Sequence, residues 1–386
     1  MNQSFHTHYQ KQNRESPKQI RSFLAAMVKH QASDLYLTVN SPAALNIQGE
    51  LKRLGQTELT ADVLQAWVRQ LLTDQEHQIY MKEREINKGL SIEGIGRFRL
   101  NAYFQRGSVS MVIRYIRANV LNPDSLKIPI VLKSLIMQRS GLLLFVGATG
   151  AGKSTSMASL LEYRNQRVGG HILTIEDPIE FTFTHGKSII SQREVGTDTL
   201  SYHNAMREAM REAPSIIMVG EIRDTETMEA VMGFADTGHL ALSTLHATNT
   251  IQALERMLYL YPSNQKQRVL MDLSLNLKGI IAQRLVRGLD NQRHLTTEIL
   301  INTPYVAELI RKGDFQALPE VLAKGSSDGM QTFDQSLYQH YQDGIISRED
   351  AMDHATSRNN MLHQVSFNAP THQKNSQSQD SLPDLV

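Results

Sequence analysis

Short apolar runs separated by helix-patterned segments mark the chain from about residue 132 onwards. The runs are Leu142–Val146, Ile172–Ile175, Ile216–Val219 and Leu240–Leu245. Further elements are expected as helices near 250–260, near 265–285, after Pro304 and after Gly329, and as a strand at Glu298–Ile301. Buried runs that alternate with helices are typical of a parallel sheet covered by helices. The pattern predicts an α/β domain over residues 132–358.

A different pattern precedes this region. Apolar residues recur at helical spacing over Gln19–His30, and Asp34–Val39 alternates as a strand does. Arg97–Phe104 and Ser110–Ile116 have the composition of strands and are close enough in the chain to pair with each other. These elements predict a small α+β domain over residues 19–117.

The remaining segments are polar. Residues 118–131 contain Pro123 and Pro129 and are predicted to be a linker. Residues 1–18 and 359–386 are rich in polar side chains with little apolar content, which predicts disordered tails. Because the first segment has no apolar core, no signal peptide is expected.

Composition narrows the class of protein. Lys and Arg number 40 and Asp and Glu 39, so no strong charge points to nucleic acid as the main partner. The chain has no cysteine, which excludes disulfides, thiolate zinc sites and a cysteine nucleophile, and which fits a reducing cytosol. No apolar run approaches the roughly 20 residues of a membrane helix. We therefore expect a soluble protein, which could still dock on a membrane complex.

The strongest chemical signal lies between the first apolar run and a helix-patterned segment. It fits the pattern of Gly, four residues and Gly-Lys-Ser, and comprises Gly147, Ala148, Thr149, Gly150, Ala151, Gly152, Lys153, Ser154 and Thr155. The glycines let backbone N–H groups crowd round phosphates, and the helix N-terminus adds partial positive charge. Lys153 can reach the β- and γ-phosphates and Ser154 can ligate Mg²⁺, so ATP and Mg²⁺ are the expected cofactors. The alternative is a glycine-rich turn that binds nothing, and the flanking strand and helix argue against it.

Two other apolar runs end in carboxylates. Glu176, Asp177 and Glu180 follow the second run, and strand ends in such sheets face the ligand crevice. Carboxylates there can hold Mg²⁺ through its water shell, although a simple acidic turn is an equal alternative. Glu221 follows the third run and could polarise the water that attacks the γ-phosphate. The alternative for Glu221 is an exposed acid at a strand end.

Histidines bracket the fourth run. His239 and His246 are seven positions apart, and side chains that far apart on a strand point to opposite faces. They therefore cannot easily form one metal pair. One could touch the phosphate side while the other orients a neighbour, and two hydrogen-bonded structural histidines are the simpler alternative.

Arginines form the last candidate group. Arg207 and Arg211 are four positions apart on a predicted helix and share a face. Arg97 and Arg99 share a face of their predicted strand, and Arg114 lies on the paired strand. Some of these should form surface ion pairs. In an oligomeric ATPase, however, an arginine from one part can stabilise charge on a nucleotide held by another.

The order of these segments resembles that of the secretion ATPase superfamily, and within it the type IV pilus retraction ATPases of the PilT/PilU kind. The resemblance covers about residues 20–350. Its matching segments are Walker A at Gly147–Thr155, an aspartate box at Thr174–Glu180, a family stretch at Arg193–Leu200, Walker B at Ile217–Asp224 and a histidine box at Gly238–His246. Several boxes in the right order are far more specific than any one alone.

The resemblance implies a PAS-like N-terminal domain followed by a RecA-like P-loop domain, with copies of the chain forming a homo-hexameric ring. It implies ATP hydrolysis coupled to pilus retraction and twitching motility at the inner face of the cytoplasmic membrane, with an inner-membrane pilus platform protein as a partner. Glu221 falls on the family's catalytic glutamate. Arg99 and Arg114 match arginines of the N-terminal domain that approach nucleotide.

The residues and the resemblance together give the candidate sites. The candidate catalytic residues are Glu221, Lys153 and Glu180. The candidate nucleotide-binding residues outside the P-loop are Arg99, Arg114, Arg207, Arg211, His239 and His246. The candidate Mg²⁺ ligands are Ser154, Glu176, Asp177 and Glu180.

Departures from the family pattern refine the expectation. Assembly and secretion members usually carry a four-cysteine zinc module, and its absence favours a retraction-type motor. Tyr305–Gly313 retains only Leu-Ile-Arg of the helix typical of PilT, and a polar segment follows Asn359. Both features look more like accessory members of the PilU type, which implies a PilT-type partner ATPase. The alternatives are a ring translocase on nucleic acid and a nucleotide-binding adaptor without catalysis.

Overall fold

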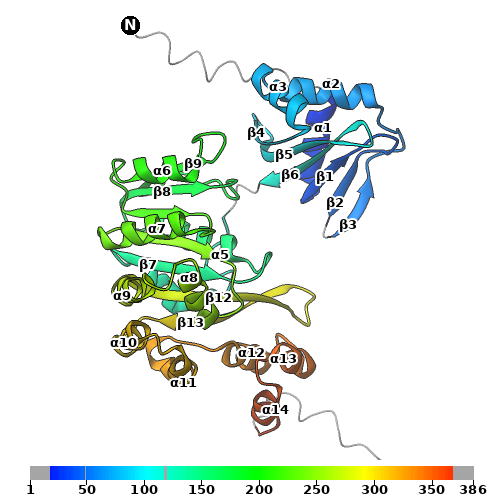
Figure 1. Ribbon diagram of the computed structural model, residues 1–386. Coiled ribbons are helices and arrows are strands. Elements are labelled where there is room, and N and C mark those ends of the chain that lie inside the picture. The colour runs from blue at the N-terminus through cyan, green and yellow to red at the C-terminus, as the bar shows by residue number, and fades with distance from the viewer. Residues whose placement is uncertain (1–17, 48, 117–119, 368–386) are drawn as a thin grey trace, which may run out of the picture. The chain divides into compact units, whose positions relative to one another are not determined.

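The computed structural model describes residues 18–47, 49–116 and 120–367 and shows two compact units (Figure 1). The first unit comprises Met1–Val120, Glu176–Phe183 and Gln192–Ser201. The second comprises Leu121–Ile175, Thr184–Ser191 and Tyr202–Val386. Two segments from the middle of the chain therefore pack with the N-terminal part. Of the tails predicted over 1–18 and 359–386, residues 1–17 and 368–386 lie outside the described residues.

The first unit is built on a six-stranded antiparallel sheet in the order β3-β2-β1-β6-β5-β4. Its strands are β1 (Asp34–Leu37), β2 (Ala44–Ile47), β3 (Glu50–Arg53), β4 (Glu85–Ile92), β5 (Gly96–Gln105) and β6 (Ser108–Ile116). Its helices are α1 (Lys18–Lys29), α2 (Ala61–Leu71) and α3 (Asp74–Glu83). The predicted pairing of two strands in this region is confirmed as β5 with β6.

Strand alternation in β5 separates a core face from a polar face. Phe98 and Leu100 are fully buried in one hydrophobic core, which also takes apolar side chains from all three helices. Arg97 and Arg99 alternate with these residues and so point to the other face. Arg114 lies directly opposite Arg99 on β6, which places the arginines on one surface of the sheet.

The second unit contains a seven-stranded sheet in the order β13-β12-β7-β11-β10-β8-β9. Its strands are β7 (Gly141–Val146), β8 (Gly170–Glu176), β9 (Ser188–Glu194), β10 (Ile216–Val219), β11 (Leu240–Leu245), β12 (Leu277–Arg287) and β13 (Arg293–Ile301). Strands β12, β7, β11, β10 and β8 run parallel, and β13 is antiparallel to β12. The predicted parallel sheet is confirmed, and all six residues of β7 are buried, as expected for a central strand.

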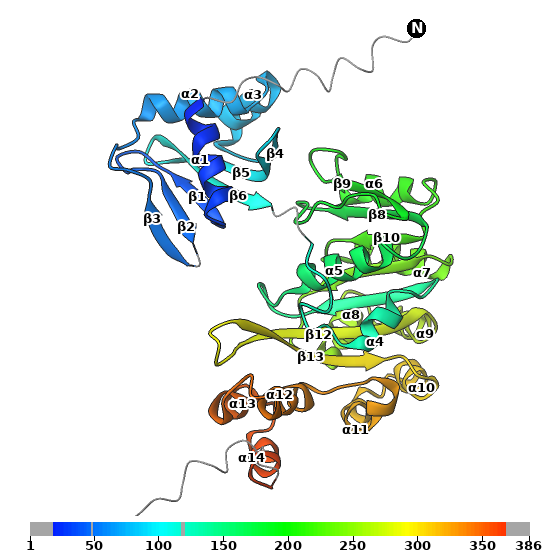
Figure 2. The same cartoon turned by 180° about the vertical axis from the view of Figure 1, so that it is seen from behind.

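Helices cover both faces of this sheet. Helices α7 and α9 lie on the face turned towards the viewer in Figure 1, and α4 and α5 lie on the opposite face, which Figure 2 shows. The helices up to the end of the sheet are α4 (Ile130–Leu135), α5 (Lys153–Asn165), α6 (Tyr202–Ala209), α7 (Thr225–Asp236), α8 (Thr250–Tyr259) and α9 (Lys266–Asn276). The helices after β13 are α10 (Pro304–Lys312), α11 (Leu318–Lys324), α12 (Phe333–Gln342), α13 (Arg348–His354) and α14 (Arg358–Phe367). Along the described ranges, no helix combines the length and apolar character needed to cross a bilayer.

Two sequence expectations need correction. The helix predicted near 265–285 ends at Asn276, and β12 follows it, because this strand pairs with β7 and buries Ile280 and Ile281 completely. The disorder expected from residue 359 is wrong over residues 359–367, which belong to α14. Met361 and Val365 of that helix are buried against α12 in a small hydrophobic cluster, although the segment is otherwise polar.

Candidate nucleotide-binding site

The P-loop joins the central strand β7 to helix α5. Gly147, Gly150 and Gly152 have positive φ angles of 152°, 79° and 88°, a region that side chains with a Cβ rarely adopt. A Cβ on Gly147 would lie 2.6 Å from the carbonyl oxygen of Gln283 on β12. The first glycine of the motif is therefore required both by its own backbone and by the close approach of the neighbouring strand.

Lys153, the first residue of α5, folds back over the loop. Its Nζ donates hydrogen bonds to the carbonyl oxygens of Gly147 and Ala148, at 2.8 and 3.0 Å. No side chain caps the N-terminus of α5. An uncapped helix start with a lysine beside it is an arrangement that suits bound phosphate.

A cavity of about 440 Å³ opens beside the P-loop. It is lined by Gly147, Ala148, Thr149, Gly150, Ala151, Thr248, Gln283, Arg284, Leu285, Arg293 and His354. The lining contains two arginines and no carboxylate, so it favours an anionic ligand. Sequence reasoning missed Arg284, Arg293 and His354, since no motif links them to the P-loop. Arg284 also lies in the region that was mistaken for a helix.

Glu221 follows β10 and is held between two donors. Its Oε2 accepts a hydrogen bond from Arg223 Nε at 2.8 Å, and its Oε1 lies 3.0 Å from His246 Nε2. The side chain is 21% exposed, so water can reach it. The structure thus brings together two of the predicted residues, Glu221 and His246. The structure also places Arg223 beside Glu221. This arginine lies in the Walker B stretch, but the sequence pattern predicted no role for it.

His239 is not part of this group. His239 precedes β11 and His246 follows it, so the two histidines lie at opposite ends of this strand. The carbonyl oxygen of His239 accepts a hydrogen bond from Gly141, the first residue of β7, while the P-loop follows the last. Its Nδ1 lies within 3.2 Å of the Phe234 carbonyl oxygen. These contacts agree with the alternative that His239 is a hydrogen-bonded structural histidine. Its position before the start of β11 does not agree with a contact to a nucleotide bound at the P-loop of the same chain.

We expect His246→Ala to lower the turnover number by about 10- to 100-fold, because a hydrogen bond to a charged group contributes about 1.5–3 kcal/mol and here orients Glu221. Steady-state ATPase assays on folded protein would measure it. His239→Ala is the matched control and should keep normal turnover. Equal losses in both variants would contradict the separation of the two histidines.

Arg207 and Arg211 form surface ion pairs. Both contact Glu208, with Arg207 Nε at 3.1 Å and Arg211 Nη1 at 2.7 Å from its carboxylate oxygens. Both are exposed, and neither lines the cavity beside the P-loop. Their contact with a nucleotide held by another copy of the chain stays a prediction.

The acidic segment after β8 belongs to the first unit. Glu176 is buried, and its Oε2 accepts the backbone N–H of Glu180 at 3.3 Å, while Asp177 and Glu180 are exposed. A cavity of about 370 Å³ is lined by Ser33, Arg99, Arg114, Tyr115, Ile116, Pro178, Ile179, Glu180 and Phe181. The structure therefore brings Arg99, Arg114 and Glu180 to one cavity. Arg114 is held there by Asp34, whose Oδ1 lies 2.8 Å from Arg114 Nε.

Few side chains among the residues that the structure describes are arranged to bind Mg²⁺. Within the described residues, no three His, Cys, Asp or Glu side chains converge on a point that could hold a metal ion. Mg²⁺ commonly takes most of its ligands from phosphates and water, and it then needs few protein donors. Ser154, the second residue of the uncapped helix α5, fits such a site. Ligation by Ser154, Glu176, Asp177 and Glu180 stays a prediction.

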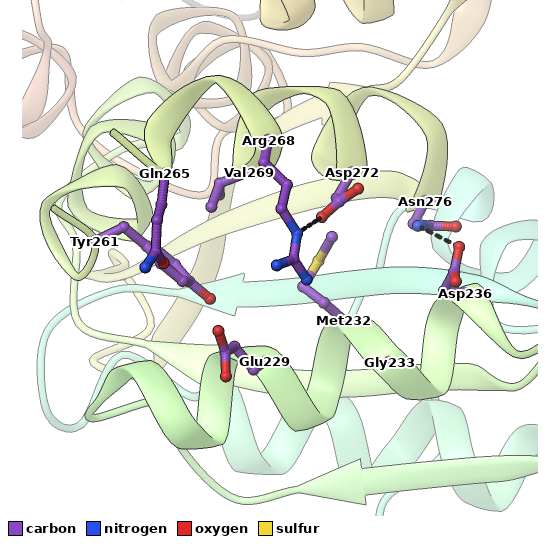
Figure 3. Close-up of a pocket in the computed structure, with 10 residues that line it drawn as sticks. All are labelled: Glu229, Met232, Gly233, Asp236, Tyr261, Gln265, Arg268, Val269, Asp272 and Asn276. Carbon is purple, nitrogen blue, oxygen red and sulfur yellow. Dashed lines mark hydrogen bonds and ion pairs between the residues drawn. The ribbon is translucent and has the colours of Figure 1, made fainter. Parts of the chain in front are cut away.

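A third cavity, of about 190 Å³, lies between α7 and α9 (Figure 3). Its lining includes Glu229, Asp236 and Asp272, with Arg268 paired to Asp272 at 3.6 Å. Burial, followed by the charge of Glu229, raises the pKa of Tyr261 to about 12. None of the predicted site residues lines this cavity, and its acidic lining suits a nucleotide poorly.

Comparison with known proteins identifies the family. A family model described as type II/IV secretion system protein matches residues 11–308. The chain belongs to this family. It is 44% identical over 344 residues to the type IV pilus ATPase PilU of Pseudomonas aeruginosa, covering 89% of this chain and 90% of that protein. It is 36% identical over 336 residues to the type IV pilus retraction ATPase PilT of the same organism, covering 87% and 98%.

A solved structure gives the same result. A crystal structure of the pilus retraction motor PilT with bound ADP superposes with a TM-score of 0.83 and 37% identity, covering 89% of this chain and 99% of that one. The resemblance to the PilT/PilU ATPases and the expected fold are confirmed. Because these relatives are ATPases, they support ATP hydrolysis by this member of the type II/IV secretion system family.

Proposed function

We propose that the chain is an ATP-hydrolysing motor of type IV pilus retraction and twitching motility. The observation that carries the proposal is the likeness to PilU along nine-tenths of both chains, together with an intact Lys153 on the P-loop and an intact Glu221 beside His246. A nucleotide-binding adaptor without catalysis would have no need of an oriented carboxylate at this strand end.

Strand order suggests how the nucleotide lies. The P-loop follows β7, with Glu221 on the side of β11 and β10, and with the cavity arginines on the side of β12 and β13. If the γ-phosphate faces Glu221, then the α-phosphate and the nucleoside face Arg284 and Arg293. This orientation uses the positive lining for the part of the ligand that Lys153 does not reach.

These positions suggest the role of each residue in hydrolysis. Lys153 and the loop N–H groups bind phosphate, and Glu221 accepts the proton of the attacking water while Arg223 and His246 hold its carboxylate. Ser154 would contribute a ligand to Mg²⁺, which when bound neutralises phosphate charge. Arg99 and Arg114, held on one sheet face, would approach the nucleotide as positive charges.

The likeness to PilU also suggests an accessory role. We propose a homo-hexamer, peripheral at the inner face of the cytoplasmic membrane, that acts with a PilT-type ATPase on an inner-membrane pilus platform protein. Nucleic acid is not an expected partner. The basis in this chain is α10, which departs from the PilT sequence and exposes Tyr305 beside the surface ion pair of Glu308 and Lys312.

Deleting the PilT-type partner in a cell that keeps this protein is expected to abolish pilus retraction. The reason is that α10 departs from the helix typical of PilT while Lys153 and Glu221 are kept, so hydrolysis and mechanical output can be separated in this chain. Retraction events can be counted by fluorescence microscopy of labelled pili. Robust retraction without the partner would contradict the accessory role, and ATPase activity stimulated by DNA in a salt-sensitive way would favour a nucleic-acid translocase.

A further inference from the structure

An ion pair in the first unit joins its sheet to the end of β9. Arg97 Nη2 on β5 lies 2.9 Å from Glu194 Oε2, and the two side chains are 24% and 4% exposed. A carboxylate this deeply buried is costly unless a positive charge and further donors compensate it. The burial of the Glu194 carboxylate therefore depends on the positive charge of Arg97.

The same carboxylate also holds the acidic segment. Its Oε2 accepts the backbone N–H of Ile179 at 3.2 Å, and its Oε1 accepts the hydroxyl of Thr197 at 3.2 Å. Ile179 lies directly between Pro178 and Glu180, which line the cavity of Arg99 and Arg114. One side chain thus connects β5 to the segment that carries the candidate Mg²⁺ ligands.

The neighbouring strand leaves room for this carboxylate. Gly89 on β4 has an ordinary backbone conformation, but a Cβ there would lie only 2.7 Å from Glu194 Oε1. The absent side chain is therefore explained by the close approach of Glu194 and not by a turn.

Stability alone does not account for the arrangement. Arg97 Nε is buried and has no hydrogen-bond partner among the described residues, which costs free energy. Buried ion pairs often contribute little net stability compared with well-packed apolar residues. What the pair does supply is a fixed position, because it ties a charged group on the sheet to one backbone N–H of the acidic segment.

We propose that Arg97 and Glu194 are a positioning pair that fixes the acidic segment Glu176–Glu180 on the N-terminal sheet, and that ATP hydrolysis depends on it. The inference rests on the proposed roles of this segment and of Arg99 and Arg114. Arg97 and Arg99 lie on the same face of β5, so the pair fixes Glu180 relative to the arginines of its cavity. Neither member touches the reacting atoms.

The test compares Arg97→Met, Arg97→Lys and a control in the full-length oligomer. Arg97→Met should lower the turnover number roughly 10- to 100-fold, since small misplacements of a catalytic segment have effects of this size. It should also reduce the gain in affinity for a fluorescent ATP analogue on adding Mg²⁺, while affinity in EDTA stays the same. Arg97→Lys should restore part of both.

Lys88→Met is the matched control. Lys88 of the adjacent strand β4 is also mostly buried and pairs with Glu76 of α3, away from the acidic segment. It should lower the melting temperature without changing turnover of the folded protein. Equal loss of turnover in Lys88→Met and Arg97→Met would overturn the proposal, as would normal turnover in well-folded Arg97→Met.

Gly89→Ala provides a route that removes no charge. The new methyl group should displace Glu194 and reproduce the changes seen in Arg97→Met, even if the latter fails to fold. Unchanged Mg²⁺-dependent affinity in folded Gly89→Ala would overturn the positioning role. A wild-type protein with no turnover would instead refute the proposed function, and the affinity measurement would still test the pair.

Discussion

Glu221→Gln is expected to keep ATP binding and to slow hydrolysis by roughly 10²–10⁴-fold, the usual effect of losing a general base. Glutamine has the shape of glutamate but cannot accept the proton of the attacking water. Binding should persist because Lys153 and the loop amides provide most of the contacts to phosphate. Single-turnover hydrolysis measured alongside equilibrium binding of ATP would separate the two effects.

Glu226→Gln is the control for this substitution. Glu226 lies in the first turn of α7, a few residues further along the chain, and is exposed. It should behave as the wild type in both assays. If Glu221→Gln lost binding but hydrolysed each bound ATP at the normal rate, Glu221 would be a binding residue and the assigned role would be wrong.

Lys153→Ala is expected to remove nucleotide turnover without unfolding the chain. Hydrogen bonds to charged groups contribute about 1.5–3 kcal/mol, so ATP affinity should fall by at least about tenfold. The fold should survive because the hydrogen bonds of Lys153 Nζ to the carbonyl oxygens of Gly147 and Ala148 stay within the loop and join no other element. Circular dichroism and nucleotide titration would measure both properties.

Lys324→Ala serves as the matched lysine variant, since Lys324 forms an exposed pair with Glu320 on α11 far along the chain. Both variants should give the same circular dichroism spectrum, and only Lys153→Ala should lose turnover. Normal ATPase activity in folded Lys153→Ala would refute the assignment of the P-loop as the site.

The sequence predicted the sheet well where strands are short and buried on both faces. The apolar runs before Gly147 and Glu221 became β7 and β10, because short apolar runs bounded by turn residues suit strands that are buried on both faces. It failed at Leu277–Arg287, where helix-forming residues such as Ala282 and Leu285 stand among the strand-forming residues Ile280 and Ile281. There, pairing with β7 and burial of the isoleucines outweigh local propensity.

The candidate site was predictable where its residues lie within one motif. Lys153 follows directly from the P-loop pattern, and Glu221 from a buried run that ends in an acid. Arg293 could not be found in this way, because only the pairing of β13 with β12 brings it to the P-loop cavity. For His239 the sequence left a nucleotide contact and a structural role open, and the hydrogen bond of its Nδ1 to the Phe234 carbonyl oxygen favours the structural role.

Because two segments from the middle of the chain belong to the first unit, the two units cannot be separated by one cut in the chain. A fragment that ends at Val120 would lack Glu176–Phe183 and Gln192–Ser201, and it would remove Glu194, the acid with which Arg97 pairs. A chimera that joins the N-terminal part of one family member to the P-loop part of another would put residues of different origin on the two sides of this contact. Exchanges of parts between such motors should therefore carry the segments up to Ser201 together with the N-terminal sheet, or match Arg97 and Glu194 by design.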